Sequence, residues 1–367
     1  MAMKNKNLFR ICSLLFASAL SVAGCADKVG NPTGPGTTNT NEGMGRLVYT
    51  ANVPFGYPTS LMIIDSNGST IANVTSKIPN ITYGVAWNSG GGRFVWLGVD
   101  TTFPNGINDV IVSNNSGTLT TVFYQSHGDT LVAFPVLSPD GSHVAIVMRH
   151  GSPQGSRRIL VMTLESSGDS IIAINPHFIS TSVVIGTIPC FSPDGSKIAY
   201  FDISGKLIVA ASDGSSSVPV ATIRSGVNGI NGIWTIDWST SNKLAFIDAV
   251  SDTGALPLCV VNSDGTGLVT IDTGYSPSWS PDGKTLAYSN NSGDIIITSD
   301  LGVTKKNLTN NQHDNDFPSW SPDGKKIVFT ANAGPISSLT PSIVSIDVAT
   351  KAMKTLEPSG GFATWLR

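Results

Sequence analysis

Short apolar runs recur along most of this chain, and the clearest of them are separated by one repeated turn signal. In each case an apolar or aromatic residue precedes Ser-Pro-Asp-Gly, and a run rich in β-branched and aromatic residues follows it. Four close copies lie at 134–148, 188–202, 276–290 and 317–331. Such runs are typical of β-strands, and Pro and Gly at the second and fourth turn positions are typical of a tight hairpin. The pattern predicts a series of β-hairpins.

The repeats are spaced as the blades of a β-propeller are. Their aligned apolar or aromatic positions are 87, 137, 191, 238, 279, 320 and 365, at intervals of 41 to 54 residues. An interval of this length holds four short strands, which is the content of one propeller blade. The sequence therefore predicts an all-β fold, a β-propeller of four-stranded blades.

The two ends of the chain predict how the ring closes. The repeat near the C-terminus has expected strands at 316–321, 326–330, 341–347 and 353–356. Residues 46–50 match the second strand of this order, whereas residues 361–365 match the first. We therefore predict that the C-terminal strand joins the N-terminal strands in a composite blade, which leaves no exposed edge. Six complete repeats and this composite give seven blades, with six or eight as the alternatives.

The repeated phrase resembles the PD40 repeats of TolB-like propellers, in which an aromatic residue is followed by Ser-Pro-Asp-Gly-Lys and Ile-Ala-Phe. The resemblance is closest at 276–290 and 317–331, and as a fold assignment it covers about 45–367. It implies a propeller that binds other proteins of the bacterial envelope, as TolB binds a peptidoglycan-associated lipoprotein. TolB also has an N-terminal α/β domain and six blades, neither of which the present sequence predicts.

The N-terminus has the features of a lipoprotein signal. Residues 1–24 are a basic start followed by an apolar run, and residues 22–25, Val-Ala-Gly-Cys, resemble a bacterial lipobox. We expect Cys25 to be acylated, residues 25–44 to form a flexible tether and residues 45–367 to form the propeller. The alternative is a transmembrane anchor, for which the apolar run is short. The expected location is the bacterial cell envelope, with the outer membrane favoured.

The charge of the chain limits its partners, and its cysteines limit its disulfides. The formal net charge is −3, and loss of residues 1–24 leaves 19 basic against 25 acidic residues. Such a surface does not attract nucleic acid or anionic lipid, so we expect no nucleic-acid partner and a membrane contact through the lipid anchor alone. We expect the ring to be monomeric. For Cys190 and Cys259 we expect buried, reduced thiols, with a disulfide as the alternative.

Polar and aromatic residues precede several of the predicted first strands. In propellers of this kind, as the resemblance implies, the loops that lead into first strands approach the central channel. The candidate binding rim for a peptide or glycan consists of His313, Asp314, Asp316, His127, Asp129, Asn228, Asn231, Tyr83 and Tyr275. The alternative for any one of them is a solvated loop residue. His313, Asp314 and Asp316 also have the residue types of a divalent-metal site, but no second ligand set supports it, and we expect no metal.

The aspartates of the turn signal have a simpler interpretation. Asp140, Asp194, Asp282 and Asp323 occupy the same turn position in four repeats. Asp in such turns accepts hydrogen bonds from nearby backbone amides, and repetition in every copy favours a structural role over a metal site.

The sequence contains no nucleophile elbow, no His-Glu-x-x-His and no phosphate-binding loop, and we expect no cofactor. The predicted function is a non-enzymatic, lipid-anchored propeller that binds an envelope protein, a peptide or a glycan. One alternative is a carbohydrate-active or lactone-active enzyme with several carboxylates or histidines converging in the channel. Another is a structural envelope or surface-layer module that associates with itself.

Overall fold

The computed structural model is built almost entirely of antiparallel β-strands. It describes residues 45–51, 60–77, 81–90, 92–100, 107–117, 120–125, 130–131, 135–149, 156–167, 170–180, 182–183, 187–223, 235–248, 256–310, 314–332 and 341–366. Within these ranges the one helical segment is a short 3-10 turn at Thr75–Lys77. None of the described residues forms a helix of the length and apolarity that crossing a membrane requires.

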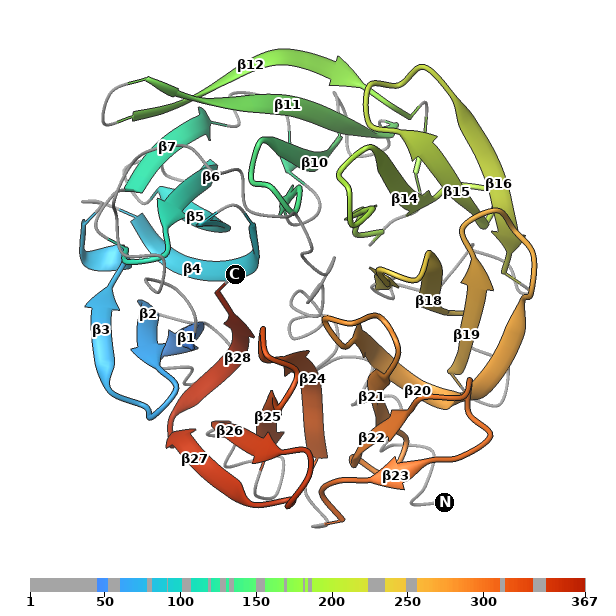
Figure 1. Cartoon of the computed structure of the whole chain (residues 1–367). Helices are drawn as coiled ribbons and strands as arrows, with labels where there is room; N and C mark the ends of the chain where they lie inside the picture. Colours follow the sequence, from blue (N-terminus) through green and yellow to red (C-terminus); the bar gives the residue numbers. More distant parts are fainter. Residues whose placement is uncertain are drawn as a thin grey trace, which may run out of the picture.

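Four of the six sheets have four strands each, as a propeller blade has. From inner to outer strand they are β28 (Gly360–Trp365), β1 (Arg46–Ala51), β2 (Ser60–Asp65) and β3 (Thr70–Asn73); β4 (Ile81–Gly90), β5 (Arg93–Asp100), β6 (Ile107–Asn114) and β7 (Thr120–Gln125); β13 (Cys190–Phe191), β14 (Lys197–Phe201), β15 (Lys206–Ala211) and β16 (Ser217–Thr222); and β24 (Asp314–Trp320), β25 (Lys326–Asn332), β26 (Ser342–Asp347) and β27 (Met353–Glu357). In Figure 1 the sheets surround a common centre, with β28 and β24 near it and β3, β16 and β27 on the circumference. The arrangement is that of a β-propeller.

The fifth sheet has an inner strand in two pieces. Its strands are β8 (Thr130–Leu131), β9 (Val136–Leu137), β10 (His143–Arg149), β11 (Arg157–Ser167) and β12 (Ser170–Phe178), and both β8 and β9 pair with β10. The region 155–187, where the sequence gives the weakest strand pattern, thus holds two long strands that pair with each other.

The sixth sheet joins two four-strand units through one continuous strand. Its strands are β17 (Ile236–Trp238), β18 (Lys243–Ile247), β19 (Pro257–Asn262), β20 (Val269–Trp279), β21 (Leu286–Asn290), β22 (Ile295–Thr298) and β23 (Lys306–Asn307). The strand β20 runs without a break to Trp279 because its partner changes without a loop: Thr273 pairs with β19 and Gly274 with β21. Glycine is needed at 274, where a Cβ would lie 2.5 Å from the carbonyl oxygen of Ser289.

The predicted hairpin turns are present in all four close repeats. In the last of them, the amide of Gly324 donates to the carbonyl of Ser321 at 2.8 Å, and Gly324 has a φ of 69°. The Ser321 hydroxyl donates to Asp323 at 2.7 Å, and Asp323 accepts from the amide of Lys325 at 3.1 Å. The turn aspartates are therefore engaged by their own turns.

The aligned aromatic and apolar positions of the repeats form the core between sheets. Leu137, Phe191, Trp238, Trp279, Trp320 and Trp365 each keep 2% or less of their surface exposed. Because burial of a large aromatic side chain is worth several kcal/mol, these positions hold neighbouring sheets together.

The strand near the C-terminus pairs with the first described strand of the chain. β28 lies antiparallel to β1, from Leu47 opposite Trp365 to Ala51 opposite Gly360. The amide of Leu366 donates to the carbonyl of Arg46 at 2.9 Å, and the Thr50 hydroxyl donates to the carbonyl of Gly361.

Candidate functional site

Three of the predicted rim residues occupy one equivalent position in three inner strands. Tyr83, Tyr275 and Asp316 each lie four residues before an aligned tryptophan, and the register of the strand pairing shifts at or just after each of them. The next residue in two of these strands, Ser276 or Phe317, precedes a proline and has a positive φ of 54° or 55°. A residue before proline rarely has this conformation, and such bulges reorient side chains.

Asp316 is the centre of a hydrogen-bonded cluster between two sheets. Its Oδ1 accepts from the hydroxyl of Ser276 at 3.1 Å, from the hydroxyl of Ser289 at 3.3 Å and from the amide of Phe317 at 2.8 Å. Ser276 and Ser289 belong to β20 and β21, so the carboxyl group of β24 is bound to the preceding sheet. Ser276 and Ser289 are buried, and Asp316 is partly buried.

The surroundings of Asp316 favour its neutral form. Desolvation raises the pKa of Asp316 to about 7, and the charge of Asp314 acts in the same direction. The three hydrogen bonds, which favour the charged carboxylate, offset only part of this effect. Asp316 therefore changes its charge close to neutral pH.

The residues before Asp316 are divided between surface and interior. Asp314 is exposed at the start of β24, opposite Asn332. Asn315 is fully buried, and its amide nitrogen Nδ2 donates to the carbonyl of Gly293 at 2.8 Å. Asn315 thus holds the strand in place, while Asp314 and Asp316 remain as the acidic groups at this end of it.

Other inner-strand groups are linked from sheet to sheet. Asp237 is fully buried in β17 and accepts from the amide of Trp279 at 2.5 Å. The indole nitrogen of Trp320 donates to the carbonyl of Ser278 at 3.0 Å. The hydroxyls of Ser319 and Thr364 lie 3.4 Å apart. The inner strands β17, β20, β24 and β28 are therefore connected in sequence by polar contacts.

Two sheet junctions also contain a pair formed by a tyrosine and an acid. The hydroxyl of Tyr288 donates to Asp272 at 2.5 Å, and Lys305 lies 2.9 Å from the same carboxylate oxygen. The hydroxyl of Tyr49 donates to Glu357 at 3.0 Å. Burial and the neighbouring carboxylate raise the pKa of both tyrosines, which stay protonated as donors. Tyr49 and Tyr288 lie in second strands, and both acids lie at the outer-strand position of the preceding four-strand unit.

Of the remaining rim predictions, two concern tyrosines that the structure describes and the others concern residues that it does not describe. Tyr275 is wrong as a surface aromatic, because it lies at the strand irregularity and keeps only 6% of its surface exposed. Tyr83 is placed in β4 by its backbone alone. The predictions that lie outside the described residues are Cys25, His127, Asp129, Asn228, Asn231 and His313.

Sequence reasoning missed the acids that act through distant partners. Asp237 stands where two close repeats have Ser278 and Ser319, and this replacement of Ser by Asp was the available signal. The roles of Asp272 and Glu357 had no comparable signal, because each depends on a tyrosine in the next four-strand unit.

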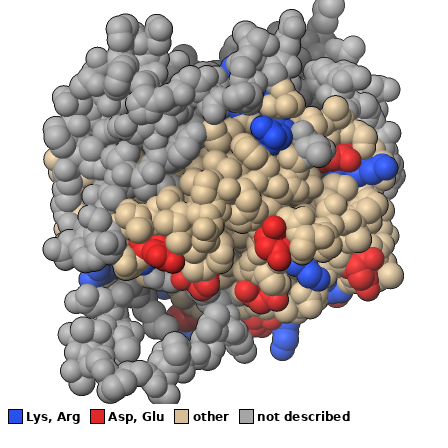
Figure 2. All heavy atoms as spheres, turned by 90° about the horizontal axis from the view of Figure 1, so that it is seen from above, with Lys and Arg blue, Asp and Glu red and all other residues tan. Residues whose placement is uncertain are grey.

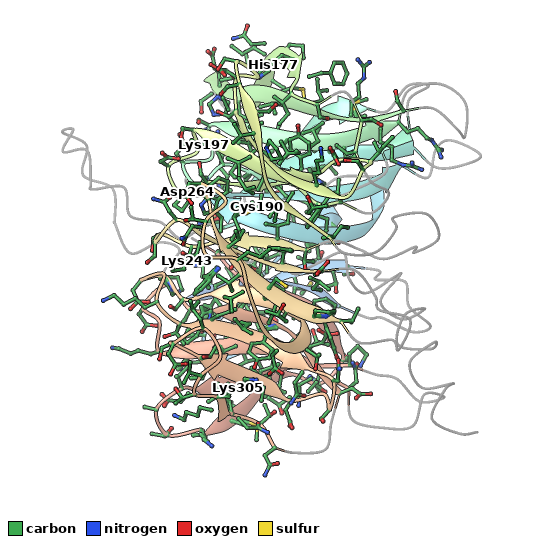
Figure 3. The ribbon with its side chains drawn as sticks, turned by 90° about the vertical axis from the view of Figure 1, so that its right-hand side faces the viewer. His177, Cys190, Lys197, Lys243, Asp264 and Lys305 are labelled. Carbon is green, nitrogen blue, oxygen red and sulfur yellow. The ribbon has the colours of Figure 1, made fainter. Side chains whose placement is uncertain are left out.

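The face with the hairpin turns lies at the other end of the strands from Asp314 and Asp316. Figure 3 shows Lys197, Lys243 and Asp264 along one side of the ring, each in or beside a hairpin turn. Hydrogen bonds from the hydroxyl and amide of Thr266 lower the pKa of the exposed Asp264. On the side drawn in Figure 2, the described acidic and basic side chains are interspersed and no large patch has a single sign.

The two described cysteines, Cys190 and Cys259, lie in β13 and β19. Cys190 and Cys259 are both buried and form no disulfide with each other, as predicted. Within the described ranges, no three His, Cys, Asp or Glu side chains come together as a metal ion would require.

No family model and no curated protein matches the sequence. Among solved structures, TolB from Acinetobacter baumannii is 17% identical with a TM-score of 0.49, over 72% of this chain and 63% of that one. The chain thus spans less than two thirds of the length of that TolB.

Two other solved structures are similar over more of the chain. Oligogalacturonate lyase from Vibrio parahaemolyticus is 11% identical with a TM-score of 0.53, over 85% of this chain and 93% of that one. The dihydro-heme d1 dehydrogenase NirN is 12% identical with a TM-score of 0.52, over 92% and 78%. Likeness at these identities shows the fold. The chain is a β-propeller, and TolB propellers are among the structures that it resembles.

Proposed function

We propose that this chain is a non-catalytic binding scaffold of the bacterial cell envelope. It is held by a lipid on Cys25 at the outer membrane, and residues 25–44 tether the propeller to that anchor. The ring presents the face at which the inner strands begin, near Asp314 and Asp316, to an envelope protein or peptide or to a glycan. The lipobox-like segment and the TolB-like repeats support this location.

The observation that carries the proposal is that the inner-strand polar groups already have partners within the protein. Asp316 is bound by Ser276, Ser289 and the Phe317 amide, and Asp237 is bound by the Trp279 amide. Among the described residues, no histidine and no second carboxyl group is hydrogen-bonded to Asp316. A general acid or base must exchange a proton with its substrate, and three donors of the protein already occupy Oδ1 of Asp316, whereas a binding surface needs a rigid frame.

We also propose that the ring has seven blades and that β28 closes it. The pairing of β28 with β1 supports closure. So does the contact between Tyr49 and Glu357, which repeats across this junction the contact that Tyr288 and Asp272 make at an internal junction. Seven units follow if the continuous strand β20 serves two blades, as the outer strand of one and the inner strand of the next.

A second candidate is an enzyme that acts on sugars or lactones. It is favoured by the likeness of the chain to an oligogalacturonate lyase, at a TM-score of 0.53, and by a carboxyl group whose pKa is raised to about 7. In that case Asp316 is the general acid or base, and a substrate lies over Asp314 and Asp316.

One experiment separates the two candidates. The detergent-purified chain is incubated with oligogalacturonate, with and without a divalent cation, and is used in parallel to capture proteins from a detergent extract of the envelope. The scaffold predicts no turnover and a stoichiometric protein partner, whose recovery falls for Asp314→Asn. Turnover that is lost in Asp316→Asn, while the protein remains folded, contradicts the scaffold and supports the enzyme.

A further inference from the structure

Two arginines face each other across the hairpin formed by β10 and β11. Arg149 and Arg157 are directly opposite in the strand register, on the same side of the sheet as Val147 and Ile159. Arg158 points to the other side, where its guanidinium lies 3.9 Å from the centre of the Phe178 ring. The hairpin thus carries one arginine with an aromatic partner and two arginines that are neighbours of each other.

The register places this pair on the same ring face as Asp314 and Asp316. Arg149 is opposite Thr130, the first residue of the inner strand β8. In the repeat of β24 and β25, the corresponding pair is Asp314, the first residue of its inner strand, and Asn332. The Ser-Pro-Asp-Gly turns of both sheets lie at the other end of the strands. The arginine pair is therefore part of the face to which we assign binding.

The pair is electrostatically unfavourable in isolation. Like charges directly opposite in a sheet repel each other. The Nε of Arg157 is buried and has no hydrogen-bond acceptor, and a buried donor without an acceptor costs about 1–3 kcal/mol. Desolvation, and to a smaller extent the charge of Arg149, lower the pKa of Arg157, so both disfavour the charged guanidinium at this position. An anion bound between the guanidiniums relieves the repulsion and supplies the missing acceptor.

We propose that Arg149 and Arg157 form a carboxylate-binding site for an acidic segment of a protein partner. A guanidinium presents paired N–H donors that match the two oxygens of a carboxylate. Arg149 and Arg157 are partly exposed, whereas Val147 and Ile159, the next side chains on this side of the sheet, are buried, so a bound segment meets charged donors here and not an apolar surface. The inference rests on the proposed scaffold function and names the chemistry of its partner.

The test uses the full chain in detergent and fluorescence anisotropy of a labelled hexaglutamate peptide. We expect Arg149→Gln and Arg157→Gln to weaken binding at least tenfold, and added salt to weaken it as well. Arg158→Gln, which removes the same charge on the other side of the sheet, is the matched control and is expected to change binding less than twofold. Equal binding by the wild-type chain and Arg157→Gln overturns the proposal. Arginine-dependent binding of trigalacturonate, without binding of hexaglutamate, overturns the assignment to an acidic peptide.

Folding and function are separated by two further measurements. Because each Gln variant removes a repulsion, its thermal midpoint is expected to equal or exceed that of the wild type. Arg157→Lys keeps the positive charge but not the paired N–H donors of the guanidinium, and it is expected to bind the peptide with intermediate strength. In capture from envelope extract, equal recovery of a partner by the wild-type chain and Arg157→Gln overturns the carboxylate site and leaves the scaffold. Recovery of no partner by either overturns the scaffold, and the hexaglutamate result still decides whether the arginine pair binds carboxylates.

Discussion

Replacing Asp316 by asparagine is expected to remove a pH-dependent loss of stability. Asp316 lies between two sheets, and its pKa is raised from the ordinary 3.8 to about 7. Between these two values the unfolded chain is ionised at this position while the folded chain holds a proton. The folded state binds more protons there, so stability falls as the pH rises from about 4 to about 7 and then stays level.

The size of the effect follows from the shift. A difference of one pKa unit corresponds to about 1.4 kcal/mol, so the rise from 3.8 to about 7 corresponds to about 4 kcal/mol. The amide of the Asp316→Asn variant would not titrate, and its Oδ1 could still accept hydrogen bonds from Ser276, Ser289 and the Phe317 amide. We therefore expect the free energy of unfolding of Asp316→Asn, relative to wild type, to increase by roughly 2–4 kcal/mol between pH 4.5 and pH 8.

The assay is urea unfolding followed by fluorescence of the 7 tryptophans at several pH values. Asp314→Asn is the matched control, since the same chemical change two residues away affects an exposed side chain. Because the control keeps Asp316, its stability is expected to fall with pH as that of wild type does, and the difference between the two is expected to vary little, apart from a small lowering of the Asp316 pKa when the charge of Asp314 is removed. A difference between Asp316→Asn and wild type that does not vary from pH 4.5 to pH 8 would refute the reasoning.

Two pairs of matched substitutions and one thiol probe test the packing of the core. Gly283→Ala is expected to lower the free energy of unfolding by at least about 3 kcal/mol, because its Cβ would lie 2.2 Å from the Thr240 hydroxyl oxygen. Gly324→Ala has a similar φ and no atom nearer than 3.9 Å to its Cβ, and it is expected to lower the same free energy by about 1 kcal/mol. Equal losses of the two variants in urea unfolding would contradict this expectation. Tyr288→Phe is expected to cost about 1–2 kcal/mol by losing its bond to Asp272, and Tyr200→Phe, for which the described residues provide no hydrogen bond to lose, under about 0.5 kcal/mol. Cys190 and Cys259 are expected to react with a thiol reagent only after unfolding, since both are buried; rapid reaction of the folded chain would count against their burial.

Much of the fold was predictable because its signals are local. The turn from Ser321 to Gly324 needs a proline, a capping aspartate and a residue with positive φ, and all three are consecutive in the sequence. The strands on either side follow from short apolar runs, and the predicted strands 341–347 and 353–356 agree with β26 and β27 to within one residue at each end. The continuity of β20 was not predictable in this way, because a strand ends or continues according to which neighbours it pairs with.

The candidate site was less accessible, since its contacts join residues that are far apart in sequence. Asp316 was identified as a polar residue near the channel, but its partner Ser276 is 40 residues earlier and becomes a neighbour only when two sheets pack. Tyr275 was expected at the surface, and its burial follows from the bulge and the packing of the adjacent sheet. The facing of Arg149 and Arg157 depends on the register of one hairpin, which a shift of one residue would abolish.

The central claim is that the ring is an anchored scaffold that binds a protein partner, and in-cell cross-linking tests it most directly. The full-length chain is cross-linked in living cells, purified by affinity and examined by mass spectrometry beside Cys25→Ser as the unanchored control. The account predicts one envelope protein in stoichiometric amount with the wild-type chain, and markedly less with Cys25→Ser or Arg157→Gln. Recovery of no envelope protein from cells in which the wild-type chain is folded and acylated would contradict it.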